Sequence, residues 1–500
     1  MKRFNSMIDG QINKSEKLFT AINPFDQSEI EVNSFATKQI VEKAVYSARE
    51  ALKSWRNTPV VERAAILIRA AELIITEQGN PGDLLHTEIM ELIVTEMGKS
   101  VYEAEIEIFE TSDILTYYAT EGLKFLSTQQ PTLDQNLWST KTSKLVFEPV
   151  GVVGVIKPWN YPLEIPIWSI GAALLAGNTI VFKPSEITSG IGCYIEKIFR
   201  EAGLPSGVLN VVLGDGIVGD YLVEANVDMI SFTGSNAVGN SIYKKCSDKM
   251  IKCALELGGK DAFIVCDDAD IERAANGAVW GAFVNAGQVC VSAERVYVHS
   301  SIYEEFMESV VEITRSLKIG SGFDDEVDIA PLAFEKQFEK VKHLIADAIS
   351  KGVNVRIGGK PINRKGYFFE PTILDNISSD MLIEKDELFG PIMPVYKFDT
   401  VEEVISLANY SVFGLGASVW SQNIEKAEQI SKELATGMVW INDINIALPQ
   451  CPWGGVKQSG NSCDLSQFGI YEYTKVKHVC IENSHDKTQP WWYPYKKIDK

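Results

Sequence analysis

The sequence predicts an α/β protein made of two doubly wound α/β domains, a Rossmann-like one and a second one, plus a small β element. Two observations carry this prediction. Apolar, β-rich runs alternate with amphipathic helical segments between about residues 145 and 260, and a second series of the same kind follows. The chain has 500 residues, of which 45% are hydrophobic, which is enough for two or three cores.

The first predicted elements are helices. Residues 37–75 contain two segments, QIVEKAVYSAREALKSW and VERAAILIRAAELI, in which apolar residues recur at helical spacing. Residues 129–150 are first polar and then alternating, and we expect a hairpin that leaves the first domain. The aromatic, proline-rich tail, DKTQPWWYPYKKIDK, is expected to be exposed. The hairpin and the tail are candidate subunit contacts.

The predicted strands form two series. The first comprises residues 151–158, 178–184, 209–214 and 227–234, with a helix at 192–203. The second comprises strands at 261–268, 295–299, 355–359, 417–420 and 438–443, with helices at 301–317 and 426–435. A parallel sheet gathers its loops at the carboxyl ends of its strands, so we expect ligands to bind there.

The composition excludes several classes of partner. The chain carries 47 basic and 67 acidic residues, a net charge of −20, so nucleic acid and anionic membrane surfaces should repel it. The basic N-terminus has no apolar run of signal-peptide length after it, and no window reaches the roughly 18 apolar residues of a membrane span. Eight scattered cysteines without a CxxC pair fit a reducing compartment. We expect a cytoplasmic protein without a structural metal.

One cysteine stands in a segment that looks like a site. Cys290, in NAGQVCVSAERV (285–296), follows a small Ala-Gly-Gln turn. A cysteine nucleophile must be a thiolate, and imidazole is its usual activator, yet none of the five histidines lies in such a segment. The base is therefore sought among carboxylates. Taken alone, Cys290 is also consistent with a small buried hydrophobe.

Three further motifs are each only weak evidence for a ligand site when taken alone. SFTGSNAVG (231–239) ends a strand and opens a helix, a geometry that offers backbone N–H groups to a phosphate, although it is not GxGxxG. FKPSE (182–186) ends a buried strand. LELGGK (255–260) places Glu256 before a Gly-Gly turn, where a ligand can approach the backbone closely.

Together, the motifs are specific. PWNYP (158–162), KPSE (183–186), FTGS (232–235), ELGGK (256–260), GQVC (287–290) and ELFGP (387–391) occur in the order and spacing of the NAD(P)-dependent aldehyde dehydrogenases, and the sequence resembles that family from INPFD at 22 to YTKVKHV at 473–479. The resemblance implies an NAD-binding domain at 1–128 and 149–256, a catalytic domain at 257–460, and an oligomerisation or bridging element at 129–148 and 461–500.

The resemblance also implies a mechanism. In the family, the thiol attacks the aldehyde, the hemithioacetal gives a hydride to the nicotinamide, and the thioester is hydrolysed. Cys290 matches the nucleophile, and Glu256 matches the general base that deprotonates the thiol or the hydrolytic water. Asn160 matches the side-chain donor to the oxyanion, and the backbone N–H of Cys290 is the other donor.

The cofactor contacts carried over from the family are seven: Trp159, Lys183, Glu186, Gly216, Ser235, Glu387 and Phe389. Lys183 and Glu186 suit the adenine ribose, Ser235 the pyrophosphate, and Glu387 the nicotinamide ribose. The carboxylate of Glu186 repels a 2′-phosphate, which favours NAD over NADP.

Three aromatic residues, Tyr161, Trp168 and Trp453, match positions that line the family's substrate tunnel. The sequence is similar to the betaine-aldehyde and aminoaldehyde branch, in which such rings surround an ammonium group by cation–π attraction. An apolar tunnel for neutral aldehydes is the alternative.

Some positions depart from the branch. Val284 replaces an aromatic residue, Ser169 a common lysine, and Ser462, Cys463 and Asp464 replace Gly, Arg and Glu of the familiar SGxGREL. These changes affect the prediction of the substrate and not that of the reaction. Two other readings are a CoA-acylating enzyme, which Glu256 argues against, and a homologue that has lost the reaction. We expect a homodimer or homotetramer.

Overall fold

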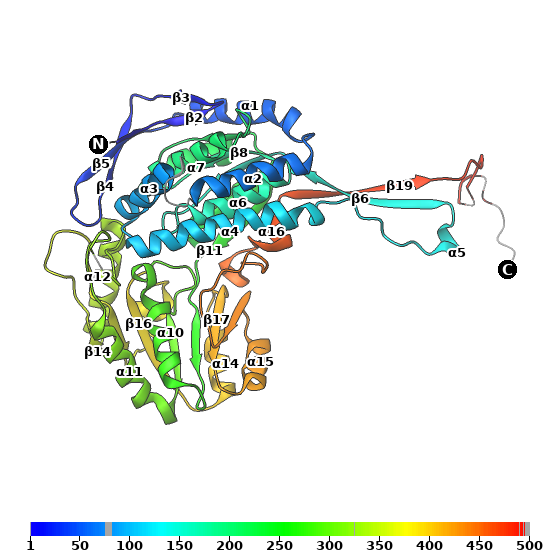
Figure 1. Ribbon diagram of the computed structural model, residues 1–500. Helices are drawn as coiled ribbons and strands as arrows, with labels where there is room; N and C mark the ends of the chain where they lie inside the picture. The colour runs from blue at the N-terminus through cyan, green and yellow to red at the C-terminus, as the bar shows by residue number, and fades with distance from the viewer. Residues whose placement is uncertain (1, 76–82, 325, 490, 494, 496–500) are drawn as a thin grey trace.

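The computed structural model describes residues 2–75, 83–324, 326–489, 491–493 and 495, and its two seven-stranded sheets form the two halves seen in Figure 1. The first sheet has the order β11-β10-β7-β8-β9-β2-β3. Its first five strands are parallel, and β2 and β3 add an antiparallel edge. The bounds are β11 (Lys252–Leu257), β10 (Met229–Gly234), β7 (Val152–Ile156), β8 (Thr179–Lys183), β9 (Leu209–Val211), β2 (Ser6–Ile8) and β3 (Gln11–Asn13).

Helices cover both faces of this sheet. One face packs against α1 (Lys38–Trp55), α8 (Gly216–Glu224) and α9 (Asn236–Asp248), and the other against α6 (Glu164–Leu175) and α7 (Ser189–Glu201). Outside α6 and α7 lie α2 (Val60–Ile74), α3 (Asp83–Leu92) and α4 (Val101–Phe125). Every residue of β7 and β8 is buried, as expected for strands covered on both faces. The two predicted helices at 37–75 and the predicted strands of the first series are confirmed.

A three-stranded sheet lies beside this half, with the order β1-β5-β4 and the bounds β1 (Lys2–Phe4), β5 (Glu29–Ser34) and β4 (Leu18–Ile22). Helix α4 begins with a capping box, in which Ser100 and Glu103 exchange hydrogen bonds with each other's backbone N–H. This cap fixes where the helix starts, which matters below because α4 carries several site carboxylates.

The second sheet has the order β14-β15-β16-β13-β12-β17-β18 and is parallel except for the edge strand β14. Its strands are β14 (Asn354–Ile357), β15 (Thr372–Asp375), β16 (Ile392–Phe398), β13 (Arg295–His299), β12 (Ala262–Val265), β17 (Gly416–Trp420) and β18 (Met438–Ile441). The sequence reasoning found the other five but missed β15 and β16. The doubly wound α/β prediction holds for both halves.

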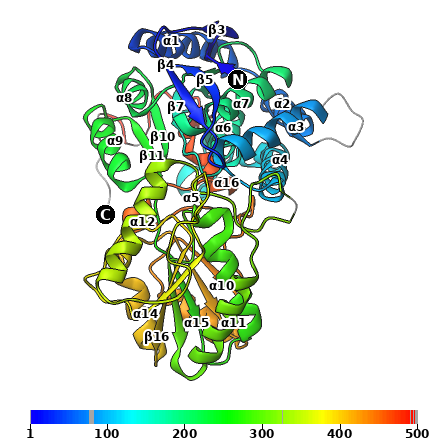
Figure 2. The ribbon, with the colours of Figure 1, turned by 90° about the vertical axis from the view of Figure 1, so that its left-hand side faces the viewer.

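Helices of the second half also lie on both faces of its sheet. One face carries α10 (Ile271–Phe283) and α11 (Tyr303–Ser316), and the other α14 (Val401–Asn409) and α15 (Ile424–Glu433). Helix α12 (Glu335–Ser350), with the short α13 (Leu382–Lys385), packs on the β15 and β16 side, and α12 lies toward the first half in Figure 2. The helix α16 (Ser466–Glu472) returns to pack against α4 and α6.

The hairpin predicted at 129–150 is confirmed only at one point, where Gln129 and Leu145 form an antiparallel bridge with backbone hydrogen bonds of 3.1 and 2.8 Å. This segment contains the short α5 (Gln135–Trp138) and one long strand, β6 (Lys141–Pro149), which pairs antiparallel with β19 (Thr474–Glu482). The two strands form an arm that projects from the body in Figure 1. Alternation at 141–149 identified a strand but not its partner, because pairing is a long-range choice. The predicted exposure of the tail is confirmed for residues 491–493 and 495, whereas residues 490, 494 and 496–500 lie outside the described residues.

In the described residues, no helix combines the length and apolar character needed to cross a membrane. The residue ranges of the NAD-binding, catalytic and oligomerisation parts stay a prediction.

Candidate active site

A cavity of about 1040 Å³ lies along the carboxyl ends of β7, β8, β10 and β11 and extends toward the second half. This edge of a parallel sheet is where ligands are expected to bind. Ten of the residues predicted from the sequence line this one cavity: Trp159, Asn160, Lys183, Glu186, Gly216, Ser235, Glu256, Cys290, Glu387 and Phe389. The structure thus brings together residues that lie as much as 230 positions apart by their numbering.

The part of the cavity under the first sheet fits a dinucleotide. Lys183 Nζ lies 3.4 Å from Glu186 Oε2 just after β8, so a donor and an acceptor stand side by side for ribose hydroxyls. Ser235 is the N-cap of α9, but its side chain makes no capping hydrogen bond and is free for a ligand. At Gly216, where α8 begins, an added Cβ would meet nothing within 4 Å, so the backbone there is open to a ligand.

The other cofactor candidates are Trp159, in the loop after β7, and Glu387 and Phe389, which come from the second half. Trp159 packs edge-on against Phe389, with ring centroids 5.5 Å apart. Phe389 has a left-handed φ of 53°, and its backbone N–H donates to Glu294 Oε1 at 2.9 Å, which fixes this unusual conformation. Gly259 N–H donates to Glu387 Oε1 at 3.2 Å. Burial raises the pKa of Glu387 to about 7, and Glu294 acts in the same direction.

Sequence reasoning missed two cations in this cavity. Lys336 and Lys340 lie on α12 and line it from the second half. Their spacing of four residues places both on one helix face. They bring positive charge to a cavity that fits a ligand with phosphates. In the sequence, the spacing of four residues between two lysines could have indicated them.

The loop before Cys290 is held in an unusual conformation. Asn285, Ala286 and Gly287 have consecutive positive φ angles of 53°, 53° and 71°. A Cβ on Gly287 would lie 2.2 Å from the carbonyl oxygen of Gly390, so only glycine fits there. Asn285 N–H donates to Glu103 Oε1 at 2.7 Å, and Asn285 Nδ2 to the carbonyl of Asn160 at 3.0 Å. The turn that presents the thiol is therefore fixed from α4 and from the β7 loop.

Asn160 lies beside the same loop. It is buried, and its Nδ2 donates to the carbonyl oxygen of Gln288 at 3.1 Å. An amide nitrogen carries two N–H bonds, so one donor remains for another acceptor.

Glu256 is the second-to-last residue of β11 and lines the cavity. It is buried; its Oε1 accepts a hydrogen bond from Ser462 Oγ at 3.2 Å, and its Oε2 has no hydrogen-bond partner among the described residues. Burial raises the pKa of Glu256 well above its ordinary value, Asp464 adds to this, and Lys157 and Ser462 oppose it. A carboxyl group tuned upward in this way suits a general base near neutral pH.

Burial also raises the pKa of the Cys290 thiol well above its ordinary value, and Asp261, Glu387 and Glu256 act in the same direction. The thiol is thus protonated in the free protein at neutral pH, and it needs a base to become a nucleophile. Glu256 lines the same cavity as the thiol.

A second cavity, of about 350 Å³, meets the first at Cys290 and Ile165, which line both. The three predicted tunnel residues, Tyr161, Trp168 and Trp453, line this second cavity. The rings of Trp168 and Trp453 lie 5.3 Å apart at 58°. Lys99 Nζ lies 3.4 Å from the ring centroid of Tyr161, so a cation of the protein already covers one face of that ring.

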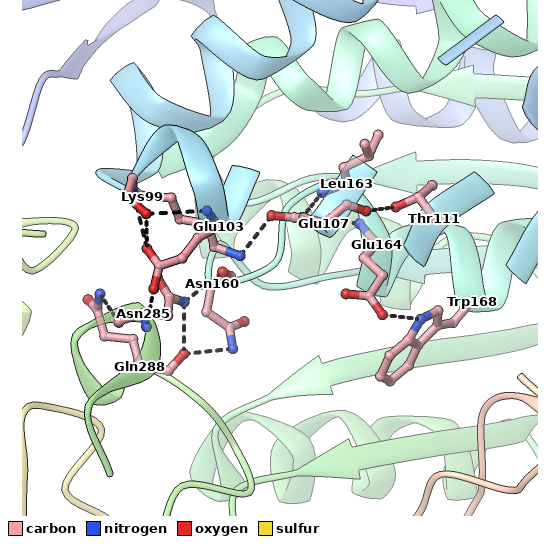
Figure 3. Close-up of polar contacts among 11 residues, drawn as sticks. Lys99, Glu103, Glu107, Thr111, Asn160, Leu163, Glu164, Trp168, Asn285 and Gln288 are labelled. Carbon is pink, nitrogen blue, oxygen red and sulfur yellow. Dashed lines mark hydrogen bonds and ion pairs between the residues drawn. The ribbon is translucent and has the colours of Figure 1, made fainter. Parts of the chain in front are cut away.

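We call this second cavity the tunnel. Acidic residues on α4 form one side of it, and Figure 3 shows two of them, Glu103 and Glu107. Glu103 and Glu110 line the tunnel, and Glu107 lies between them, fully buried. Glu107 accepts hydrogen bonds from Lys99 Nζ at 2.8 Å and from Leu163 N–H at 2.8 Å, so it joins α4 to the loop after β7. The helical spacing of 103, 107 and 110 was a signal that sequence reasoning did not use.

Glu164 adds a fourth carboxyl group. It lines the tunnel from the first turn of α6 and accepts a hydrogen bond from Trp168 Nε1 at 3.1 Å (Figure 3). Burial raises the pKa of Glu164 well above its ordinary value, and the nearby Glu110 and Glu107 add to this. Burial likewise raises the pKa of Glu110. An added cation favours ionisation of both groups.

Val284, which stands where the related branch has an aromatic residue, has an aromatic neighbour in the tunnel. Val284 lines the tunnel, and so does Trp280, which lies one helical turn earlier on α10. Trp280 is 47% exposed. Sequence reasoning missed this residue because it compared only the position six residues before Cys290.

Two of the residues that differ from the family's usual ones, Ser169 and Asp464, contact each other. Ser169 Oγ lies 3.1 Å from Asp464 Oδ1, so the two shortened side chains contact each other directly. Lys157, directly after β7, donates to Thr233 Oγ1 at 2.8 Å and lies 3.5 Å from Asp464 Oδ2. A lysine from a different element therefore supplies the positive charge beside Asp464. Cys463 is half-buried, and burial raises its pKa to about 12.

Comparison with known proteins agrees with this geometry. Residues 12–479 match the Aldehyde dehydrogenase family. The chain is 40% identical to betaine aldehyde dehydrogenase of Bacillus subtilis (94% of this chain, 96% of that protein) and 37% identical to a probable succinate-semialdehyde dehydrogenase [NADP(+)] of Sinorhizobium fredii (88% and 87%). The NAD+ complex of a Bacillus cereus aldehyde dehydrogenase superimposes with a TM-score of 0.91 at 36% identity, covering 97% of each chain.

The chain belongs to the aldehyde dehydrogenase family. It is an oxidoreductase that acts on aldehydes, with a nicotinamide dinucleotide as its cofactor.

Proposed function

We propose that the protein oxidises a cationic aldehyde, such as betaine aldehyde or an aminoaldehyde, to the carboxylic acid with NAD. The observation that carries this proposal is the composition of the second cavity, in which aromatic rings and the carboxyl groups of Glu103, Glu110 and Glu164 surround the approach to Cys290. Rings and carboxylates both attract an ammonium group. An anionic aldehyde meets repulsion from the same groups.

The proposed chemistry assigns one role to each residue. Cys290 is the nucleophile, and Glu256 takes the proton from the thiol and later from water. Asn160 Nδ2 and the Cys290 N–H donate to the oxyanion, where each preorganised donor contributes about 3 kcal/mol. Trp159, Lys183, Glu186, Gly216, Ser235, Glu387 and Phe389 hold the cofactor, which supplies a hydride acceptor. Glu186, beside the ribose, favours NAD over NADP.

The cationic head is proposed to lie among Trp168, Trp453 and Trp280, with Glu110 and Glu164 as counter-charges. Glu164 also orients the Trp168 ring through its hydrogen bond to Nε1. One face of Tyr161 is covered by Lys99, so we assign this ring to the tunnel wall.

The test compares betaine aldehyde with a neutral isostere in which carbon replaces the quaternary nitrogen. We expect the higher kcat/KM for the charged compound, and a smaller advantage in Trp453→Ala, because a cation–π contact contributes about 0.5 to 2 kcal/mol. Glu110→Gln should shrink the advantage too. Tyr410→Ala, which removes a ring that is 90% exposed and lines neither cavity, is the control. A neutral compound that is oxidised equally well or better would show a general aldehyde dehydrogenase.

We also propose that the arm of β6 and β19 joins subunits into a dimer or tetramer. The arm projects from the body and exposes apolar side chains, among them Val476 at 58% (Figure 1). Exposed apolar patches often mark interfaces. Light scattering should give a multimer for the wild type and a smaller species for Val476→Asp. A monomeric wild type would refute this part.

A further inference from the structure

Gly460 and Asn461 pair with the end of β11, and this pairing brings the next residue, Ser462, to Glu256. Asn461 N–H donates to the Leu255 carbonyl at 3.1 Å, and Leu255 N–H donates to Asn461 Oδ1 at 3.0 Å. Gly460 has a φ of 149°, and a Cβ there would lie 2.3 Å from the Leu255 carbonyl oxygen. The close approach of the two backbones therefore requires glycine, and it sets the position of the next side chains.

Ser462 makes a hydrogen bond that the usual residue at its position lacks. Glycine is common there in the family, and glycine has no hydroxyl, whereas Ser462 Oγ donates to Glu256 Oε1 at 3.2 Å. We propose that Ser462 is a positioning residue for the hydrolytic half of the reaction, because it holds Glu256 by one carboxylate oxygen and leaves the other, Oε2, to receive a proton from water. This inference rests on the proposed role of Glu256.

The step that Ser462 supports is deacylation. The water oxygen bonds to the acyl carbon, its proton passes to Glu256, and the bond between that carbon and the Cys290 sulfur breaks. Oε2 of Glu256 is buried without a hydrogen-bond partner among the residues described. A buried acceptor of this kind costs free energy unless water or substrate binds it. The unsatisfied oxygen thus marks the place where the hydrolytic water is expected.

Several charged or titratable groups surround Glu256. Asp464 and Glu472 oppose its ionisation, and Lys157 supports it. Cys290 and Cys463 lie nearby, but burial raises the pKa of both thiols, so they are neutral near pH 7. Ser462 is the neutral donor in this group. A hydrogen bond to the charged form favours that form, so loss of the hydroxyl should raise the pKa of Glu256.

The experiment uses the full-length enzyme with NAD and a saturating aldehyde that it oxidises. In Ser462→Gly, we expect the acidic limb of the kcat profile to move upward by about one pH unit, since hydrogen bonds to charged groups have that magnitude. The pre-steady-state burst of NADH should keep its amplitude. Ser462→Thr should restore the wild-type profile, because it keeps the hydroxyl.

Cys463→Ala is the matched control, since it removes a neighbouring neutral thiol and should leave the profile in place. An unshifted profile in Ser462→Gly, with a stalled acyl-enzyme in Glu256→Gln, would overturn the role of Ser462 and keep that of Glu256. If Glu256→Gln also turned over normally, the proposed function of Glu256 would fail as well. A shift that Ser462→Thr does not reverse would count as a packing effect and against the proposal.

Discussion

The side-chain amide of Asn160 donates to the carbonyl oxygen of Gln288 at 3.1 Å, which ties the loop after β7 to the loop that presents Cys290. In the opposite sense, Asn285 Nδ2 donates to the Asn160 carbonyl at 3.0 Å. The proposed nucleophile and oxyanion donor come from different halves of the molecule, and these two hydrogen bonds fix their relative position. Catalysis by positioned groups depends on such fixation.

Replacement of the proposed nucleophile is the first prediction. Cys290→Ala should lower turnover by about 10⁴-fold or more, the scale on which nucleophile removal acts, while NAD binding by titration calorimetry is retained. Cys451→Ala removes an exposed thiol and should change neither quantity. Near wild-type turnover in Cys290→Ala would remove this residue from the mechanism.

A second prediction separates the two halves of the reaction. Glu256→Gln should form about one equivalent of NADH, more slowly than the wild type because the thiol has lost its proposed base, and then stall, because the amide cannot accept the proton of the hydrolytic water. Mass spectrometry should find the acyl adduct on the peptide that contains Cys290. Unchanged steady-state turnover would mean that another base acts.

The cofactor preference is the third prediction. Glu186 stands 3.4 Å from Lys183, and its carboxylate disfavours a 2′-phosphate. Glu186→Ser should lower the ratio of kcat/KM for NAD over NADP by about tenfold, which corresponds to about 1.4 kcal/mol. Glu224→Ser, at the far end of α8, provides a control that also removes one negative charge. A wild type that prefers NADP would contradict the assignment.

The pH dependence of NAD binding is the fourth prediction. Burial raises the pKa of Glu387 to about 7, so the group is mostly protonated at pH 6 and mostly ionised at pH 8. The ionised form is the better acceptor for ribose hydroxyls, and we expect the Kd for NAD to fall by up to about tenfold over this range. Glu387→Gln should flatten the curve. An equally steep curve in the variant would assign the dependence to another group.

Stability gives the fifth prediction. Glu107 and Lys99 form a buried ion pair with an Oε2–Nζ distance of 2.8 Å, and both side chains are at most 1% exposed. Glu107→Gln leaves the Lys99 ammonium buried without its counter-charge, so we expect a loss of about 3 kcal/mol and a lower thermal midpoint. Glu121→Gln breaks an exposed pair with Lys124 and should cost less than about 1 kcal/mol. Equal midpoints for the two variants would contradict this ranking.

The sequence by itself determined the alternating α/β architecture, the two helices at 37–75 and most strands. Its resemblance to the aldehyde dehydrogenases located the ten residues that line one cavity. The helices and strands are local properties, because apolar periodicity reports which face of an element is buried.

Only the tertiary structure decided which distant segments meet. Strand β6 pairs with β19, so that Ser143 and His478, 335 positions apart, are hydrogen-bonded neighbours, whereas local alternation had favoured a hairpin. The contact of Ser462 with Glu256, the placement of Lys157 beside Asp464, and the carboxyl groups that α4 and α6 bring to the tunnel are of the same kind. Side-chain partners across elements depend on how sheets and helices pack, and a period of 2 or 3.6 residues carries no information about the partner.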